Sequence, residues 1–309
     1  MSAAPLAFGL QLPIQSQSTA FVQPWERDAG VGELVQVAQA CEAADFDYVA
    51  VCDHVAIPAD KAGTMSTEWW DTIATLSYLA AVTERVRLLS HVYVLAYRHP
   101  LVAAKAWATL DALSGGRAIL GVGAGHVEGE FDALGVPFAE RGRLLDEAID
   151  AVRAAFDAEA PSHHGPSWSF DGLGARPRPV QEHLPIWVGG SSIPAMRRAA
   201  ERGDGWLPQG PPEGGMADGI AYVRAKRETA GRTGPFTIGA LSGPLYLGDP
   251  PPELGRCVRG SAEKIAGYLR TYRDLEVDQV QVGFVSRSAE ELCDQIAGFA
   301  AEIAPLVND

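Results

Sequence analysis

Two positions in the sequence place a histidine directly after a run of apolar residues. Asp53 and His54 follow the run that begins at Tyr48, and His126 follows a second run that ends in alternating glycines. Histidine exchanges a proton near neutral pH, and a neighbouring carboxylate can orient its ring. We therefore predict His54 as a proton-transfer residue that Asp53 orients, with His126 as the alternative.

Glycines cluster at the ends of two apolar runs. Because glycine has no Cβ atom, it lets a flat ring or a phosphate approach the backbone closely. Serines and a helix start follow the second cluster, and the first turn of a helix is a ready anion site. The sequence therefore predicts a phosphate-bearing ligand, although the spacing does not match the G-x-G-x-x-G fingerprint. The residues concerned are Gly121, Gly123, Gly125, Gly189, Gly190, Ser191 and Ser192.

His126, Glu128 and Glu130 form a loose group of residue types that can bind metals. A zinc site of this kind would need a second histidine at ligand spacing, and the sequence offers none nearby. We therefore expect no metal site.

Strand-like and helix-like segments alternate along the chain and must position these residues. Near-continuous apolar runs indicate strands buried on both faces, and apolar residues at helical spacing indicate the helices between them. About eight such units predict a (β/α)8 TIM barrel, in which catalytic groups lie at the C-terminal ends of the strands. The expected strands are 8–13, 48–55, 86–95, 118–122, 185–189, 205–208, 236–247 and 279–284. The expected helices are 31–41, 68–83, 100–113, 144–156, 195–202, 222–230, 261–275 and 288–303.

An open, doubly wound sheet is the competing architecture. It places its glycine-rich turn directly after the first strand, whereas here the first strand leads into residues 11–15 without a glycine cluster. No linker divides the chain, so we expect a single α/β domain over residues 1–309 with loop insertions at the C-terminal rim. Of these loops, 56–70 and 162–174 are expected to wall a substrate pocket.

The composition narrows the class of partner. The chain has 309 residues and a formal net charge of -14, which argues against binding nucleic acid or an anionic membrane surface. Its four cysteines lie apart in apolar stretches, and no basic residues precede the first apolar run. These features are typical of a reduced, cytoplasmic protein without a secretory leader, and we expect a small-molecule substrate.

Taken in order, several short motifs resemble the luciferase-like monooxygenase superfamily, and within it the deazaflavin-dependent (coenzyme F420) oxidoreductases. The resemblance covers nearly the whole chain, and the order and spacing of the motifs make it specific. The motifs are Cys52-Asp53-His54, Tyr97-Arg98-His99-Pro100, Gly115-Gly116-Arg117, Gly121-Val122-Gly123-Ala124-Gly125, Glu130-Phe131, and Pro185-Ile186-Trp187-Val188-Gly189-Gly190.

The resemblance implies roles for particular residues. It places Asp53 and His54 beside the reactive face of a tricyclic ring, and a bulge with a non-prolyl cis peptide, at Ser90–His91, against the other face. It also implies a homodimer. The residues that it assigns to the cofactor are Asp53, Ser90, His91, Gly123, Gly125, His126, Gly189, Gly190 and Ser191. A related sugar-phosphate dehydrogenase group has a glutamate where His126 stands, so a phosphorylated sugar is not the expected substrate.

The function that follows is hydride transfer between coenzyme F420 and a small organic substrate, with His54 handling the proton. The alternative within the superfamily is an FMN-dependent two-component monooxygenase that a separate reductase supplies. From other classes, a metal-dependent TIM-barrel hydrolase and a cofactor-binding protein without turnover stay open. The sequence does not identify the substrate or the direction of transfer.

Overall fold

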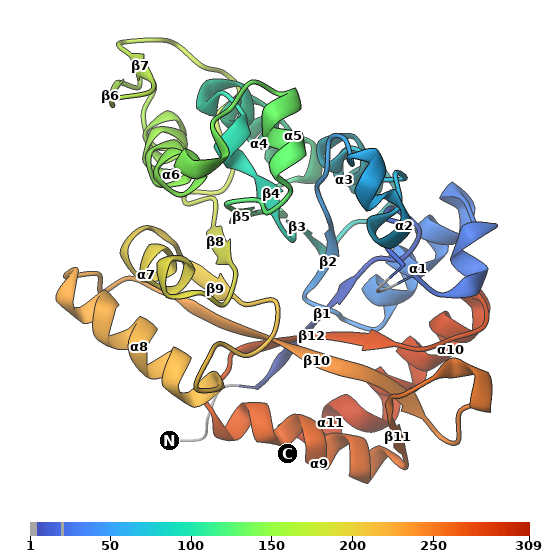
Figure 1. Ribbon diagram of the computed structural model, residues 1–309. Helices are drawn as coiled ribbons and strands as arrows, with labels where there is room; N and C mark the ends of the chain where they lie inside the picture. The colour runs from blue at the N-terminus through green and yellow to red at the C-terminus, as the bar shows by residue number, and fades with distance from the viewer. Residues whose placement is uncertain (1–4, 20–21) are drawn as a thin grey trace.

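The computed structural model describes residues 5–19 and 22–309. Eight parallel strands close into a barrel, because each strand pairs with the next around the ring and β10 pairs with both β9 and β12 (Figure 1). The ring runs in the order β1 (Ala7–Gln11), β2 (Tyr48–Val51), β3 (Arg87–Ser90), β5 (Ala118–Gly123), β8 (Ile186–Gly189), β9 (Gly205–Leu207), β10 (Thr237–Leu247) and β12 (Gln279–Phe284). The single-domain (β/α)8 prediction is confirmed, and all eight expected strands are present.

Helices connect successive strands and surround the barrel. The main ones are α1 (Val31–Ala43), α3 (Thr72–Val82), α4 (Pro100–Ser114), α6 (Arg141–Asp157), α7 (Ile193–Arg202), α8 (Met216–Thr229), α9 (Ala262–Asp274) and α10 (Ala289–Gly298). Shorter segments are α2 (Ala62–Met65), α5 (Glu128–Ala133), the π-helix Phe299–Ile303 and α11 (Ala304–Asn308). The 3-10 turns are Pro24–Arg27, Ala59–Lys61, Leu95–Tyr97, Phe138–Glu140 and Pro252–Leu254.

Local sequence explains where several helices begin. Pro100 occupies the first turn of α4, where its missing N–H is tolerated, and Gly115 ends that helix at φ 70°. The expected helix over 68–83 begins later, because the Asp71 side chain accepts a hydrogen bond from Ala74 N and caps α3. Trp69 therefore precedes the helix, in a bridge with Ser16.

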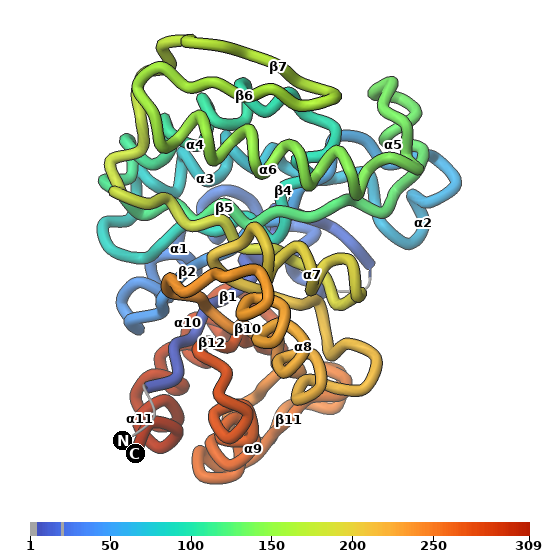
Figure 2. The backbone as a smooth tube through the Cα atoms, turned by 90° about the vertical axis from the view of Figure 1, so that its left-hand side faces the viewer, coloured from blue at the N-terminus to red at the C-terminus, as the bar shows by residue number. Residues whose placement is uncertain are grey.

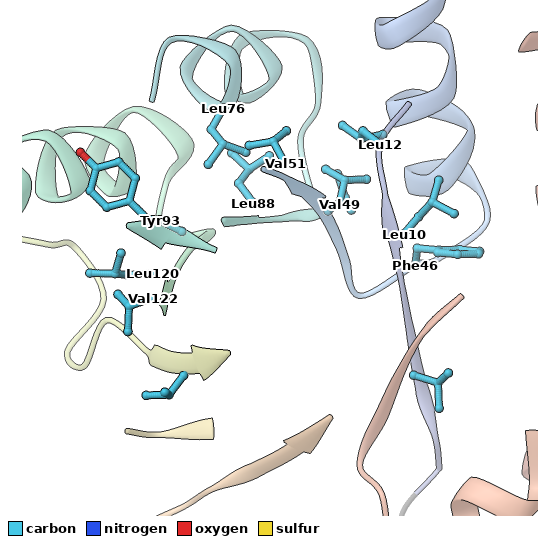
Figure 3. Packing of buried hydrophobic residues seen from close by; sticks show 14 of the residues in the cluster. Leu10, Leu12, Phe46, Val49, Val51, Leu76, Leu88, Tyr93, Leu120 and Val122 are labelled. Atoms are coloured by element: carbon cyan, nitrogen blue, oxygen red, sulfur yellow. The ribbon is translucent and has the colours of Figure 1, made fainter. Parts of the chain in front are cut away.

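The core has two layers, because successive strand residues point to opposite faces. One face packs against the helices: Figure 3 shows Val51 and Leu88 of adjacent strands beside Leu76 of α3. The other face fills the barrel. Its apolar residues are Tyr48, Ala50, Leu89, Ile119, Trp187 and Leu207.

Short strands lie outside the ring. β4 (Tyr93–Val94) continues the third strand beyond a bulge and pairs with β5, and β11 (Val258–Gly260) pairs in parallel with the end of β10. The hairpin of β6 (His163–His164) and β7 (Ser169–Phe170) lies over the outer side of α4 and α6 (Figure 2). The Glu147 carboxylate on α6 holds it by accepting hydrogen bonds from Ser167 N and Trp168 N, each at 2.8 Å. The prediction that segment 162–174 walls the pocket at the C-terminal rim is therefore wrong.

Candidate functional site

The predicted site residues follow β2, β3, β5 and β8, which are consecutive neighbours in the barrel. Because these strands are parallel, their C-terminal ends share one sector of the same rim. The segments that follow these four strands are joined by side-chain contacts.

His54 makes the central polar contact of this sector. Its Nδ1 atom lies 2.8 Å from Oε2 of Glu130, on the short helix α5 that follows β5. The other Glu130 oxygen accepts from the backbone N–H groups of Val55 and Ala56. Burial opposes the charged form of Glu130, but the His54 hydrogen bond, its charge and these N–H groups outweigh it and lower the pKa of Glu130.

The tautomer of His54 follows from this contact. An ionised carboxylate only accepts hydrogen bonds, so the His54 Nδ1 atom carries the proton. In the neutral ring, Nε2 is then the nitrogen with a free lone pair, and none of the described residues occupies it. The pair is thus a base, His54 Nε2, backed by a buried carboxylate.

Aromatic and imidazole rings surround His54. The ring of Trp69, from the loop between β2 and α3, lies 4.3 Å from the His54 ring, and the ring of His126 lies 5.6 Å away. Desolvation, together with the nearby His54 and Lys61 charges, lowers the pKa of His126. Two of the predicted catalytic residues, His54 and His126, are therefore neighbours, and loop 56–70 does border the site.

Asp53 has a different partner from the one that we predicted. Its carboxylate forms a two-point ion pair with Arg98, at 2.6 and 2.8 Å, and accepts from Val94 N and the Thr72 hydroxyl. The Arg98 guanidinium also stacks over the ring of Tyr93. Asp53 is thus buried in a structural pair between the segments after β2 and β3, and Glu130 orients His54 instead.

The bulge after β3 lies one residue further along than predicted. Ser90 still belongs to the strand, and its hydroxyl donates to Gly121 O at 2.7 Å and accepts from Gly121 N at 3.1 Å. The non-prolyl cis peptide joins His91 to Val92, so the predicted position at Ser90–His91 is wrong.

Val92, rather than a ligand, explains two of the predicted glycines. A Cβ atom at Gly123 or at Gly189 would overlap the Val92 side chain, and one at Gly121 would overlap Ser90 O. The alternating glycines therefore make room for the chain's own bulge. This packing also shows that the segments after β3, β5 and β8 meet at one place.

The remaining predicted residues line the turns after β5 and β8. Gly125 adopts φ 78° and Gly190 adopts φ 101°, conformations that favour glycine. The Ser191 hydroxyl donates to Gly210 O at 2.6 Å, and the Ser192 hydroxyl caps α7 by accepting from Ala195 N. Pro194 has no N–H and Ala195 N is capped, so within the first turn of α7 the Ile193 N–H is the group left for an anion.

Sequence reasoning missed the roles of Glu130, Val92 and Arg98. Glu130 was named as a residue type that can bind metals and as part of a family motif, and no local spacing connects it with His54, which lies 76 positions away. Among the residues that the structure describes, no three His, Cys, Asp or Glu side chains converge to hold a metal. No helix within 5–19 or 22–309 is long and apolar enough to cross a membrane.

Comparison with known proteins is consistent with this arrangement. An uncharacterised protein of Mycobacterium tuberculosis is 34% identical over 220 residues, which cover 67% of this chain and 76% of the relative. The FMNH2-dependent dimethylsulfone monooxygenase of Pseudomonas putida is 28% identical over 210 residues, covering 67% of this chain and 56% of that protein.

Two solved structures share the fold over almost their whole lengths. Monooxygenase RslO1 from Streptomyces bottropensis has a TM-score of 0.80 at 20% identity, covering 97% of this chain and 99% of its own. The coenzyme F420-dependent tetrahydromethanopterin reductase from Methanopyrus kandleri has a TM-score of 0.76 at 16% identity, covering 98% and 99%. The family model for luciferase-like monooxygenases matches residues 8–290. The chain therefore belongs to the luciferase-like monooxygenase family.

Proposed function

We propose that this protein is an oxidoreductase that transfers a hydride between coenzyme F420 and a small organic substrate. The observation that carries the proposal is the His54–Glu130 pair, which leaves His54 Nε2 without a partner among the described residues at the C-terminal rim. Family membership supports oxidoreductase or monooxygenase chemistry, and one structural neighbour uses coenzyme F420.

The residues at the rim fit a cofactor of this kind. The turn at Gly190 and the first turn of α7 suit the phosphate of a ribityl phosphate tail. The bulge at His91–Val92 and the rings of Trp69 and His54 provide flat and apolar surfaces for a tricyclic ring. A deazaflavin bound there would accept or donate the hydride at its ring carbon C5.

The chain's own contribution is proton transfer and positioning. When an alcohol substrate loses hydride from its carbon, the hydroxyl proton must leave, and His54 Nε2 accepts it. The Glu130 carboxylate then stabilises the resulting imidazolium through Nδ1. In the reverse direction the same nitrogen returns the proton to the carbonyl oxygen. His126 borders the pair and is exposed, so it is placed to pass the proton to solvent.

A second candidate has support from the comparisons. The Pseudomonas putida relative is named as FMNH2-dependent, and a two-component FMN monooxygenase would use the same barrel. Titration of the protein with coenzyme F420 and with FMN, followed by absorbance and fluorescence, separates the two. Tight F420 binding with weak FMN binding supports the proposal, and the opposite order of affinity favours the monooxygenase with a separate reductase.

We also infer that the protein forms a homodimer through the outer faces of α3 and α4. Tyr78 on α3 and Val102 and Leu113 on α4 are large apolar side chains that are exposed on these two adjacent helices. Light scattering of the protein and of a Val102→Asp variant tests this inference. A monomeric mass for the unsubstituted protein contradicts it.

A further inference from the structure

The interior of the barrel has a polar side that the proposed reaction does not use. Tyr48, His91, Gln279 and Gln281 are each at least nine-tenths buried there. Among the described residues, nine buried side-chain nitrogen or oxygen atoms have no hydrogen-bond partner, and five of them belong to these four residues. The five atoms are Tyr48 Oη, His91 Nε2, Gln279 Nε2, Gln279 Oε1 and Gln281 Oε1.

Strand register places these side chains together. Gly9 on β1 lies in register with Tyr48 on β2 and with Gln281 on β12. The Tyr48 ring lies against Gly9, where a Cβ atom would overlap it, so its hydroxyl extends toward β12. Gln279 lies two residues before Gln281 on that strand and points to the same face.

His91 extends to this side from the opposite direction. Its Nδ1 atom lies 3.2 Å from the Nε2 atom of Gln281, which links β3 to β12 across the interior. An amide nitrogen only donates, so His91 Nδ1 accepts and the ring proton is on Nε2. Burial lowers the pKa of His91 to about 4, and the nearby Leu207 carbonyl and Gln281 offset this only in part. The ring is therefore neutral near pH 7.

These groups require a partner that both donates and accepts. The Tyr48 hydroxyl and one Gln279 atom can donate, whereas the Gln281 oxygen and the other Gln279 atom accept. The His91 N–H also lies near the Leu207 carbonyl, which takes part of its hydrogen-bonding capacity. Buried polar groups in native proteins are almost always hydrogen-bonded, and a buried water makes about three such bonds. A small, neutral molecule with both capacities satisfies them all.

We infer that the barrel interior contains an ordered-water site formed by Tyr48, His91, Gln279 and Gln281. About two water molecules satisfy the five atoms at the usual number of bonds per water. His91 is also the first residue of the His91–Val92 bulge, so the site adjoins the segment that we propose contacts the cofactor ring. It depends on the interior of the fold and not on which cofactor binds.

The sign of a stability change tests the site. In a dry interior, Gln279→Leu removes an unpaired buried amide, so the midpoint temperature of unfolding would stay the same or rise. In a hydrated interior, the same change removes hydrogen bonds to water and leaves Tyr48 with fewer partners, so the temperature falls. We expect a fall. An unchanged or higher temperature would overturn the inference.

A second measurement does not depend on stability. Nitrogen-15 NMR of histidine-labelled protein, with His91 assigned from a His91→Gln variant, reports its tautomer. We expect a neutral ring with the proton on Nε2 from pH 5.5 to 8 in the protein without cofactor. Gln279→Leu retains this tautomer, whereas Gln281→Leu allows the proton onto Nδ1. A charged ring, or a proton on Nδ1 in the unsubstituted protein, contradicts the assignment.

A crystal structure that resolves water completes the test. Water within hydrogen-bonding distance of at least two of the four side chains supports the site, and its loss in Gln279→Leu identifies it. Direct pairing among the side chains, without water between them, overturns it. All of these results are independent of whether F420 or FMN binds, so failure of the proposed function leaves them interpretable.

Discussion

The imidazole of His54 donates from Nδ1 to Oε2 of Glu130 across 2.8 Å, and these residues come from the segments after β2 and β5. The pair joins two loops of the rim, because the other Glu130 oxygen holds the backbone of Val55 and Ala56. Glu130 therefore fixes both the tautomer of His54 and the path of the loop that carries it. The carboxylate adjacent in sequence, Asp53, serves Arg98 instead.

Glu130→Gln is expected to reduce turnover by about 10- to 100-fold, because a positioned proton-transfer group contributes about 100-fold or more. The amide retains the shape but no longer stabilises a protonated His54. Steady-state kinetics with the cofactor identified by titration provide the measurement. Glu128→Gln, an exposed carboxylate on the same helix, is the control and should leave turnover unchanged.

The pH profile distinguishes a positioning role from a structural one. Glu130→Gln should shift the pH dependence of kcat/KM toward lower pH, because the amide no longer stabilises the protonated imidazole of His54. In the base role, the same change moves the ascending limb to lower pH and lowers the plateau. A variant that loses activity with an unshifted profile indicates a folding defect.

Asp53→Asn is expected to destabilise the protein by about 3 kcal/mol, because it leaves the mostly buried Arg98 without its counter-charge. Chemical denaturation measures the change. The double variant Asp53→Asn/Arg98→Met removes the uncompensated charge and should recover part of the loss. If Asp53→Asn instead leaves stability intact and abolishes turnover alone, the sequence-based prediction that Asp53 orients His54 is correct.

The sequence predicted the barrel well because its signals are local. Buried parallel strands are short, continuous apolar runs, and Pro100 and Gly115 mark the ends of a helix without reference to the rest of the fold. The residues at the rim were predictable for the same reason, because they directly follow the C-terminal ends of the predicted strands. His54 and His126 were found in this way.

The partners of these residues were not predictable from local pattern. His54 and Glu130 are brought together only by the neighbouring positions of the segments after β2 and β5. Asp53 and Arg98 likewise come from the segments after two neighbouring strands, β2 and β3. No local spacing in the sequence connects them. The glycines were correctly taken as sites of close approach, but the group that approaches Gly123 and Gly189 is Val92.

Gly123→Ala is expected to destabilise the protein by about 1–3 kcal/mol, because its methyl group overlaps the Val92 side chain. Val92→Ala in the same chain should restore much of the stability, since it creates the missing space. Thermal unfolding of the two single variants and the double variant measures the coupling. Additive effects, with no rescue, would show that Gly123 is required for another reason, such as contact with a ligand.

Stability should fall in acid because of His91. Its pKa is about 4 in the folded protein, against an ordinary value of 6.5, so the unfolded chain binds an additional proton between these values. The free energy of unfolding therefore decreases as pH falls from about 6.5 to about 4, by on the order of 3 kcal/mol from this residue. Above pH 6.5 both states are neutral at His91, and its contribution no longer varies.

Urea denaturation of the protein and of His91→Gln at pH 4.5, 5.5 and 7 measures this dependence. The variant should lose less stability between pH 7 and 4.5, because glutamine does not titrate. His164→Gln is the control, since its exposed side chain meets water in both states and its removal should not change the slope. Equal slopes for His91→Gln and the unsubstituted protein would show that His91 takes up its proton as readily in the barrel as in water, which its burial among Gln281 and Leu207 does not allow.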